Sequence, residues 1–378
     1  MTGLTNSPNW MHWKRYGFLL GFLPLALPIV AWNRMETTDW QIFAWSPLVV
    51  IFGLVPLVDS LMGNDLNNPE GDVVFSPGEN LWYSALLVVV VPLQLALVFW
   101  GVGVFASGSL GLWGSLGWIL SMGVVLSTVG ITVGHELVHH KSRFEQACGG
   151  ILLASVCNGS FKIEHVRGHH QYVATPLDAS SAPMGVSVYQ QIPRAIIRNF
   201  QSAWKLESER LQKLGLPFWH WRNELLGWSS LSLCMLFVIT SYYGSWGALG
   251  FLSQSLVAIV LLEIVNYIEH YGLQRKQLPN GRYEPVTEAH SWNSPALLTN
   301  LLLFQLQRHS DHHLYARRSY QLLHHRENAP QLPYGYGAMV VLALLPPVWF
   351  RLMDSRVKAI ITPAIKTTKP SHSELWDG

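Results

Sequence analysis

The stretch GVVLSTVGITVGHELVHH (residues 123–140) joins a long uncharged segment directly to three histidines and a glutamate. On a helix, residues four apart lie on nearly the same face, so His135 and His139 can reach one ion. In a metalloprotease with this HExxH pattern, the enclosed glutamate is the general base. The pattern is weak by itself, because surface histidines at a helix end look the same. Its meaning depends on what surrounds it and on which other ligands the chain supplies.

The composition is typical of a membrane protein. Hydrophobic residues make up 49% of the 378 residues, charged residues make up 13%, and the mean hydropathy is +0.22. A membrane helix needs roughly 20 apolar residues. Six uncharged runs approach or reach that length: 17–32, 42–58, 81–106, 112–134, 225–247 and 246–262. We therefore predict an all-α, polytopic membrane protein with about six transmembrane helices, rather than a soluble protein with buried helices.

The basic residues predict the orientation of the chain in the membrane. Lys14 and Arg15 precede the first run, and many Lys and Arg occur in residues 141–222 and after Arg275. Cytoplasmic loops carry such an excess, so these segments and both termini are expected in the cytoplasm. If there are six crossings, the acidic loop 63–80 must also be cytoplasmic. Its acidic residues do not argue against this, because acidic residues count little in the orientation rule.

This topology predicts one integral-membrane domain, residues 1–378, with a histidine-rich cytoplasmic part. Two apolar stretches, 148–160 and 337–350, are too short to span and are expected to be interfacial or re-entrant. The expected order along the chain is transmembrane helices 1–4 (17–134), a cytoplasmic segment (135–224), transmembrane helices 5–6 (225–268) and a second cytoplasmic segment (269–378).

Other functional classes find little support. A net charge of +2 without a basic tract gives no reason to expect nucleic-acid binding. The three cysteines, Cys148, Cys157 and Cys234, lack CxxC spacing, so neither a thiolate metal site nor a disulfide framework is indicated.

Ten of the 16 histidines lie in four clusters, all in segments that this topology assigns to the cytoplasmic side. The clusters read HELVHH from His135, HVRGHH from His165, EHYGL around His270 and RHSDHH from His309. Spacings of three and four align rings on one helix face, and an adjacent pair can give each of two metals one ring. A catalytic zinc needs only three protein ligands, so nine or ten imidazoles favour two ions. Imidazole suits zinc, copper, iron and nickel, which leaves the metal open.

The octapeptide NYIEHYGL (Asn266 to Leu273), with HELVHH, HVRGHH and LQRHSDHH, resembles the signature and the three histidine boxes of bacterial integral-membrane alkane hydroxylases. These alkane 1-monooxygenases belong to the membrane fatty-acid desaturase and hydroxylase superfamily. The boxes alone would also admit desaturases, sterol oxidases and carotenoid hydroxylases, and the octapeptide is the specific element. Further matching segments, such as GRYEPVTEAHSWNS and RRSYQLL, extend the resemblance over most of residues 130–325. The amino-terminal third matches more weakly.

The resemblance implies a non-haem di-iron site in the bacterial inner membrane. It implies hydroxylation of the terminal methyl of medium-chain n-alkanes to 1-alkanols with O2. Electrons would come from rubredoxin and rubredoxin reductase. His140 is excluded as a ligand, because relatives can carry Lys at its position. Carried over by position, the iron ligands are His135, His139, His165, His169, His170, His270, His309, His312 and His313. The spacing leaves open how they divide between the two irons.

Nearby carboxylates are expected to orient the rings, because metal-bound imidazoles usually donate their other N–H to a carboxylate or carbonyl. Glu263 is the strongest candidate, since it precedes His270 by two helical turns and a carboxylate inside a span is costly without a partner. The candidates are Glu136, Glu164, Asp178, Glu263, Glu269 and Asp311.

An alkane has no hydrogen-bonding group, so its selection must depend on the length and width of an apolar tunnel. Aromatic residues of the predicted spans could line it: Trp45, Trp82, Trp100, Phe105, Trp113 and Trp118.

Three alternatives remain at this stage. A membrane zinc protease would use His135, Glu136 and His139 and leave most of the clustered histidines unexplained. A haem or metal carrier would use His pairs between helices without catalysis. Within the oxygenases, a xylene-type hydroxylase, a fatty-acid ω-hydroxylase or a desaturase would perform similar chemistry on another substrate.

Overall fold

The computed structural model describes residues 8–69 and 75–361 and is all-helical, as predicted. Extended pairing among these residues is confined to isolated bridges, such as that between Asn64 and Ala296. The α-helices are α1 (Pro8–Gly17), α2 (Leu23–Thr38), α3 (Ser46–Val49), α4 (Val55–Met62), α5 (Pro77–Val88), α6 (Val90–Ala106), α7 (Leu112–Val125), α8 (Thr132–Val138), α9 (Arg143–Ala154), α10 (Phe161–Glu164), α11 (His170–Tyr172), α12 (Val188–Lys213), α13 (Glu224–His270), α14 (Leu297–Leu302), α15 (His309–Leu314), α16 (Tyr336–Ala343) and α17 (Pro346–Ile361). Short 3-10 or π-helical segments are η1 (Phe18–Phe22), η2 (Gln41–Trp45), η3 (Val50–Leu54), η4 (Leu126–Ile131), η5 (His165–His169), η6 (Glu288–His290) and η7 (Tyr320–Leu322).

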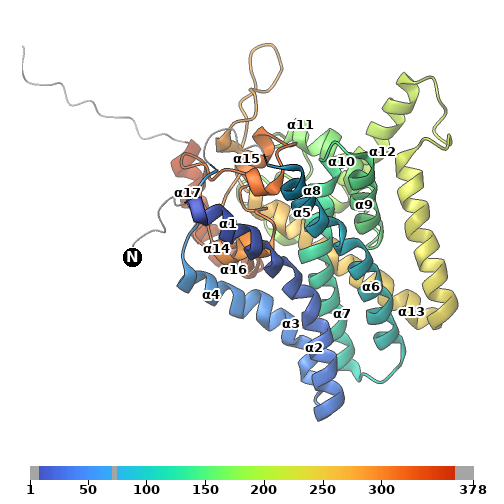
Figure 1. Cartoon of the computed structure of the whole chain (residues 1–378). Coiled ribbons are helices and arrows are strands. Elements are labelled where there is room, and N and C mark those ends of the chain that lie inside the picture. The colour runs from blue at the N-terminus through green and yellow to red at the C-terminus, as the bar shows by residue number, and fades with distance from the viewer. Residues whose placement is uncertain (1–7, 70–74, 362–378) are drawn as a thin grey trace, which may run out of the picture.

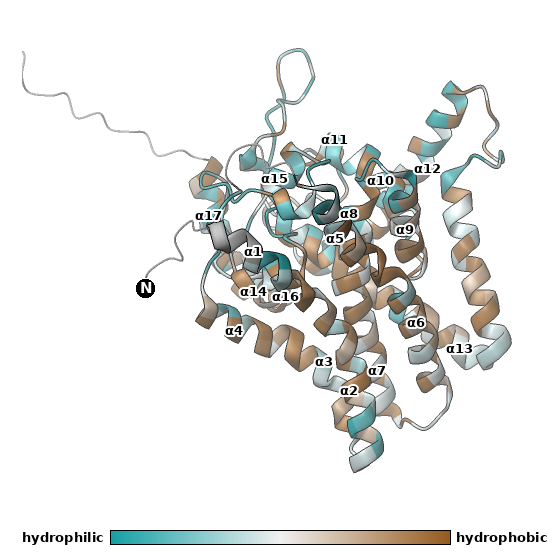
Figure 2. Cartoon of the chain, in the orientation of Figure 1, coloured by the Kyte–Doolittle hydropathy of each residue, from teal (hydrophilic) through white to brown (hydrophobic). Residues whose placement is uncertain are grey.

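The six predicted apolar runs all lie in helices that are long and apolar enough to cross a membrane. The last two runs fall in one element, α13, so the described chain has five such segments: Trp13–Thr38, Gln41–Met62, Pro77–Ala106, Leu112–Val138 and Glu224–His270. Figure 2 shows their hydrophobic colouring, with hydrophilic colouring gathered on the loops and short helices above them. The multi-pass membrane architecture is therefore confirmed.

The chain reverses within α13 at Gly244, where φ is 66° and ψ is −162°. Residues with a Cβ atom essentially never adopt this conformation, so the reversal depends on glycine. It explains why the fifth and sixth predicted runs overlap in sequence and need almost no connecting loop. In Figure 1 the reversal lies on the lower side, as do the end of α2 and the turn between α6 and α7.

The histidine-bearing segments lie together on the opposite, upper side, where Figure 1 shows α8, α10, α11 and α15. Close packing of α9 on α8 helps to fix the first histidine cluster. A Cβ atom on Gly149 would lie only 2.9 Å from the carbonyl oxygen of Gly134, so the backbones of the two helices nearly touch. Small residues allow such close approach between membrane helices. Residues 148–154 of the apolar stretch 148–160 thus belong to α9, which packs against the helix that carries His135.

The second short apolar stretch also fails to span as a straight helix. α16 and α17 are bent by 118° relative to each other, as in a broken span or a re-entrant segment, and the re-entrant or interfacial packing stays a prediction. The main apolar core draws residues from Phe18 through Val357, as a single domain requires. The predicted division of residues 1–378 into membrane and cytoplasmic segments stays a prediction, and both chain ends lie outside the described residues.

Candidate metal centre

The nine histidines expected as ligands come together and form two groups. Within each group the ring nitrogens lie within 4.8 Å of one another. The five-histidine group contains His135, His139, His165, His170 and His312. The four-histidine group contains His169, His270, His309 and His313. Three of the four sequence clusters contribute more than one ring, and two of these clusters contribute to both groups.

The π-helical turn η5 divides the second cluster between the groups. A π turn aligns residues five apart, whereas an α-helix aligns residues four apart. Accordingly, His165 and His170 face each other, with their Nε2 atoms 3.1 Å apart, and His169 turns into the other group. The sequence predicted that an adjacent pair would serve two metals, which this arrangement matches, but it did not predict the π turn.

The ring nitrogens face one another in a way that hydrogen bonding alone does not explain. In the five-histidine group, Nε2 of His312 lies 3.0 Å from Nε2 of His135 and 3.1 Å from that of His170. In the four-histidine group, Nε2 of His309 lies 3.1 Å from that of His270 and 3.0 Å from that of His313. A neutral imidazole has one N–H to share, so several Nε2 atoms that converge on one point cannot all be paired well.

Unpartnered buried nitrogens support the same conclusion. Nε2 of His139 and Nε2 of His169 are buried without a hydrogen-bond partner, one in each group. Buried polar atoms are nearly always satisfied in native proteins, so each of these atoms calls for an explanation. A metal ion in each group would satisfy them, and the donor sets fit such ions.

Burial keeps most of the rings uncharged. Burial first, and then repulsion from neighbouring rings, lowers the pKa well below its usual value for His139, His165, His170, His309, His312 and His313. Burial also disfavours the charged form of His169, but the adjacent Asp178 carboxylate outweighs it and raises the pKa of His169 to about 9. Metal ligation needs the neutral ring, so an ion bound to His169 would have to displace the proton that Asp178 favours there.

Asp178 is the predicted carboxylate whose position matches its expected role most directly. Its Oδ2 atom lies 3.0 Å from Nδ1 of His169 and accepts a hydrogen bond from the Ser181 hydroxyl at 2.6 Å. This leaves Nε2 of His169 directed into the four-histidine group. His270 is oriented by a backbone group instead, with its Nδ1 atom 3.3 Å from the carbonyl oxygen of His290.

Replacing Asp178 by Asn is expected to weaken metal binding about 10- to 100-fold, the usual effect of losing a carboxylate that orients a metal-bound histidine. Competition with a chelator, read out as metal retained per chain, measures the change. Glu145→Gln is a matched control, because Glu145 contacts His140, which lies outside both groups. Equal metal retention by the two variants would contradict this role for Asp178.

Glu263 differs from the prediction. Its carboxylate accepts hydrogen bonds from the side-chain amides of Asn199 and Asn266, at 3.1 and 3.2 Å, rather than pairing with His270. Amides therefore provide the partners that a carboxylate inside a span requires.

Glu136 and Asp311 also have partners other than the nine histidines. Oε1 of Glu136 accepts a hydrogen bond from the Tyr320 N–H at 2.9 Å and lies 3.2 Å from Nε2 of His140. Glu136, which would be the general base of the zinc-protease alternative, thus has its hydrogen-bond partners outside the two histidine groups. Asp311 forms ion pairs with Arg318 and Arg326, at 2.6 and 2.5 Å. Asp311 therefore stabilises the loop that follows α15 and does not orient one of the nine histidine rings.

Of the two remaining predicted carboxylates, Glu269 contacts a ring and Glu164 contacts a serine hydroxyl. Glu269 has its Oε2 atom 3.3 Å from Nε2 of His309, the nitrogen that faces the rest of the four-histidine group. Burial, and then the nearby Asp178 charge, raises the pKa of Glu164 to about 8, and its Oε1 atom lies 3.4 Å from the Ser202 hydroxyl.

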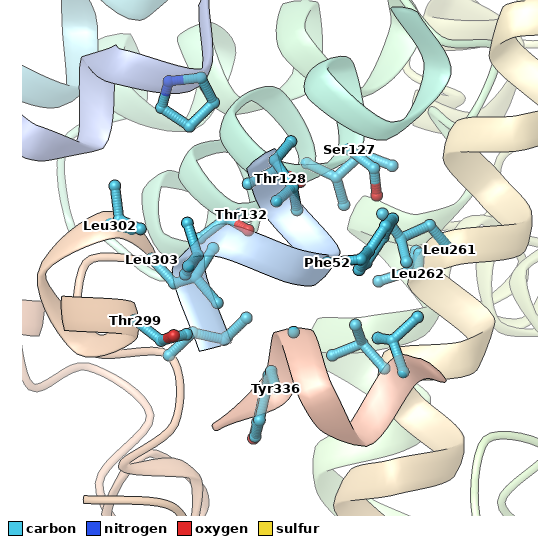
Figure 3. A pocket seen from close by; sticks show the side chains of 18 of the residues that line it. Phe52, Ser127, Thr128, Thr132, Leu261, Leu262, Thr299, Leu302, Leu303 and Tyr336 are labelled. Atoms are coloured by element: carbon cyan, nitrogen blue, oxygen red, sulfur yellow. The ribbon is translucent and has the colours of Figure 1, made fainter. Parts of the chain in front are cut away.

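An apolar cavity of about 450 Å³ adjoins both histidine groups. Figure 3 shows Phe52, Leu261, Leu262, Leu302 and Leu303 around it, with only a few hydroxyl groups among them. Three of the nine histidines also line the cavity: His135, His165 and His309. A volume of this size is usual for a small-molecule site.

The aromatic residues that the sequence suggested as a tunnel lining do not line this cavity. Trp45 and Trp113 pack against each other, with the Trp45 indole donating to the Trp113 carbonyl oxygen at 3.1 Å. Trp118 is buried and donates to the Gly101 carbonyl oxygen at 2.8 Å. The lining comes mainly from aliphatic residues of α2, η3, α13, α14 and α16, and also includes Tyr336, which sequence reasoning missed. Tyr336 lies outside every histidine cluster, so no spacing pointed to it.

Comparison with known proteins agrees with this geometry. Residues 110–343 match the fatty acid desaturase family. An alkane 1-monooxygenase 2 of Pseudomonas aeruginosa is 48% identical over 357 residues, which cover 93% of this chain and 95% of the relative. An alkane 1-monooxygenase 2 of Alcanivorax borkumensis is 44% identical and covers 94% of both chains. A xylene/toluene monooxygenase hydroxylase component of Pseudomonas putida is 27% identical over 63% of each chain.

Proposed function

Because this chain belongs to the alkane 1-monooxygenases of the fatty acid desaturase family, we propose that it hydroxylates the terminal methyl of medium-chain n-alkanes with O2. The products are a 1-alkanol and water. The observation that carries the proposal is an apolar cavity lined by His135 and His165 of the five-histidine group and His309 of the four-histidine group. A hydrocarbon in this cavity would reach the candidate metal centre without meeting bulk water.

The nine histidines are proposed to hold two iron ions, five rings at one and four at the other. Iron, when bound, supplies the activation of dioxygen, which protein side chains cannot supply. The protein holds the ligands and places the substrate. Asp178 fixes the orientation of His169, and the π turn at η5 directs His165 and His170 to one ion and His169 to the other.

The cavity walls are proposed to select the substrate by shape. Lining residues Leu23, Val30 and Leu54 are also 50 to 56% exposed on the surface that would face lipid. An alkane dissolved in the bilayer can therefore enter sideways between α2 and the η3–α4 segment. Each methylene transferred to an apolar site contributes about 0.8 kcal/mol, so a graded preference for chain length is expected.

Electrons are proposed to come from rubredoxin, which rubredoxin reductase reduces. Of the nine rings, His170 is the one that is only half-buried, so it offers the shortest route from the surface. Arg275 donates to the carbonyl oxygen of the residue that follows His170, Gln171, at 2.9 Å. A basic side chain there suits an acidic electron carrier. This face would be cytoplasmic, with the chain in the bacterial inner membrane, as the distribution of Lys and Arg predicts.

Membranes that contain the chain are expected to form 1-octanol from octane when supplied with NADH, rubredoxin reductase and rubredoxin. Octane, xylene and a fatty acid are offered separately, and the products are measured by gas chromatography. Octane should give the fastest turnover, because no lysine or arginine lines the cavity to hold a fatty-acid carboxylate. Membranes with a His312→Ala variant serve as the background. Abundant product from xylene or the fatty acid without any 1-octanol would reject the proposal.

A further inference from the structure

We propose that Tyr336 is a positioning residue that holds the Glu269 carboxylate against the four-histidine group, at the wall of the apolar cavity. The Tyr336 hydroxyl donates a hydrogen bond to Oε1 of Glu269 at 2.9 Å. The second carboxylate oxygen, Oε2, lies 3.3 Å from Nε2 of His309. Both Tyr336 and Glu269 line the cavity, and each is only 2% exposed. The inference rests on the proposed function in taking this group to bind iron.

Tyr336 is itself held firmly. Its backbone N–H donates to Oε1 of Gln307 at 2.8 Å, which ties the start of α16 to the segment just before His309. The preceding residue, Gly335, fits closely, since a Cβ atom there would lie 2.9 Å from Oδ2 of Asp59. The phenol therefore has little freedom to turn away. Figure 3 shows Tyr336 at the pocket, on a different helix from the leucines around it.

The carboxylate of Glu269 lies beside a histidine ring of the four-histidine group rather than beside a lysine or arginine. Among the described residues, no lysine or arginine forms an ion pair with it. A buried carboxylate is costly unless it is paired with a positive charge or fully hydrogen-bonded. Tyr336 satisfies one oxygen and leaves the other directed toward the nitrogens that would bind an ion. The tyrosine thereby fixes where the negative charge lies.

The two groups then differ in charge as well as in ligand number. Five imidazoles leave the full charge of an ion in place, whereas four imidazoles beside a carboxylate offset part of it. The environment around a metal tunes its electronic properties and its redox potential. The ion of the four-histidine group should therefore be distinguishable from the other, and Tyr336 should maintain that difference.

The test compares Tyr336→Phe with Tyr267→Phe in the full-length protein loaded with 57Fe. Tyr267 is an equally buried tyrosine whose hydroxyl donates to the Val186 carbonyl oxygen at 2.9 Å, so it controls for loss of a buried phenol. Mössbauer spectra of the ferrous protein should change at one of the two iron sites in Tyr336→Phe. Both sites should keep their wild-type parameters in Tyr267→Phe. Bound iron per chain should stay unchanged in both variants.

Formation of 1-octanol by Tyr336→Phe should fall about 10- to 100-fold, which is the usual effect of removing a residue that orients the groups around a metal. Glu269→Gln, which keeps the shape but removes the charge, should alter the same iron site and provides the test if Tyr336→Phe does not fold. Wild-type spectra at both iron sites in folded Tyr336→Phe, or in Glu269→Gln, would overturn the proposal. A wild-type protein that shows two iron sites but makes no 1-octanol would instead refute the proposed function alone.

Discussion

Replacing His270 by alanine is expected to reduce alkane hydroxylation to background while the protein still inserts into the membrane. His270 lies at the end of α13, and its Nε2 atom is 3.1 Å from that of His309. Its loss leaves three rings in the four-histidine group. Three ligands can still retain an ion, but they cannot reproduce its geometry or affinity. We expect iron per chain to fall from about two toward about one after washing with a chelator.

The control for this experiment is His140→Ala. His140 belongs to the same histidine-rich sequence but contacts Glu136 and Glu145 and lies outside both groups. This variant should keep most of its iron. Elemental analysis and product formation are measured on the same preparations. Full activity of His270→Ala, or iron loss in His140→Ala equal to that in His270→Ala, would contradict the proposed ligand set.

Removing the metal is expected to abolish turnover and also to lower thermal stability. Without an ion, the converging Nε2 atoms have no adequate partner, and both groups are buried in the protein. An ion that binds only the folded state stabilises it, by about 2.7 kcal/mol when present at 100 times its Kd. Thermal unfolding of the detergent-solubilised protein, followed by tryptophan fluorescence with and without chelator, measures this contribution.

Adding metals back should separate the effect on stability from the effect on catalysis. Imidazole binds zinc and iron alike, so either ion should restore most of the thermal stability. Only ferrous iron with reductant should restore hydroxylation, since zinc has no redox chemistry. Hydroxylation by the zinc-loaded protein would contradict the proposal. Peptide hydrolysis by it would favour the zinc-protease alternative.

The membrane architecture was predictable because it depends on local composition. Each long apolar run becomes a helix in the structure, since a bilayer leaves backbone groups no other partners. The fifth and sixth runs illustrate the limit of this reasoning. The sequence located both, but only the backbone at Gly244 defines a reversal within one continuous element.

The partners of the carboxylates were harder to predict, because they depend on which groups the tertiary structure brings close to each side chain. Glu263 lies on the expected face of α13, yet the amide of Asn199, on α12, reaches it instead. Glu136 has the spacing of a protease base, but the Tyr320 backbone and His140 engage it. Sequence spacing constrains neighbours on the same helix and says nothing about groups that arrive from another one.

The sequence by itself determined the all-helical membrane fold, the family and the set of nine histidines that come together. These depend on hydropathy, which acts locally, and on motifs that can be identified in the amino-acid sequence. Only the tertiary structure decided that the rings divide five and four, because the π turn at η5 pairs His165 with His170 rather than with His169 and distant helices supply the other rings. It alone decided that aliphatic residues rather than tryptophans line the cavity, and that Tyr336 meets Glu269 across 67 residues of chain. Such contacts arise from the packing of distant helices, which no local pattern encodes.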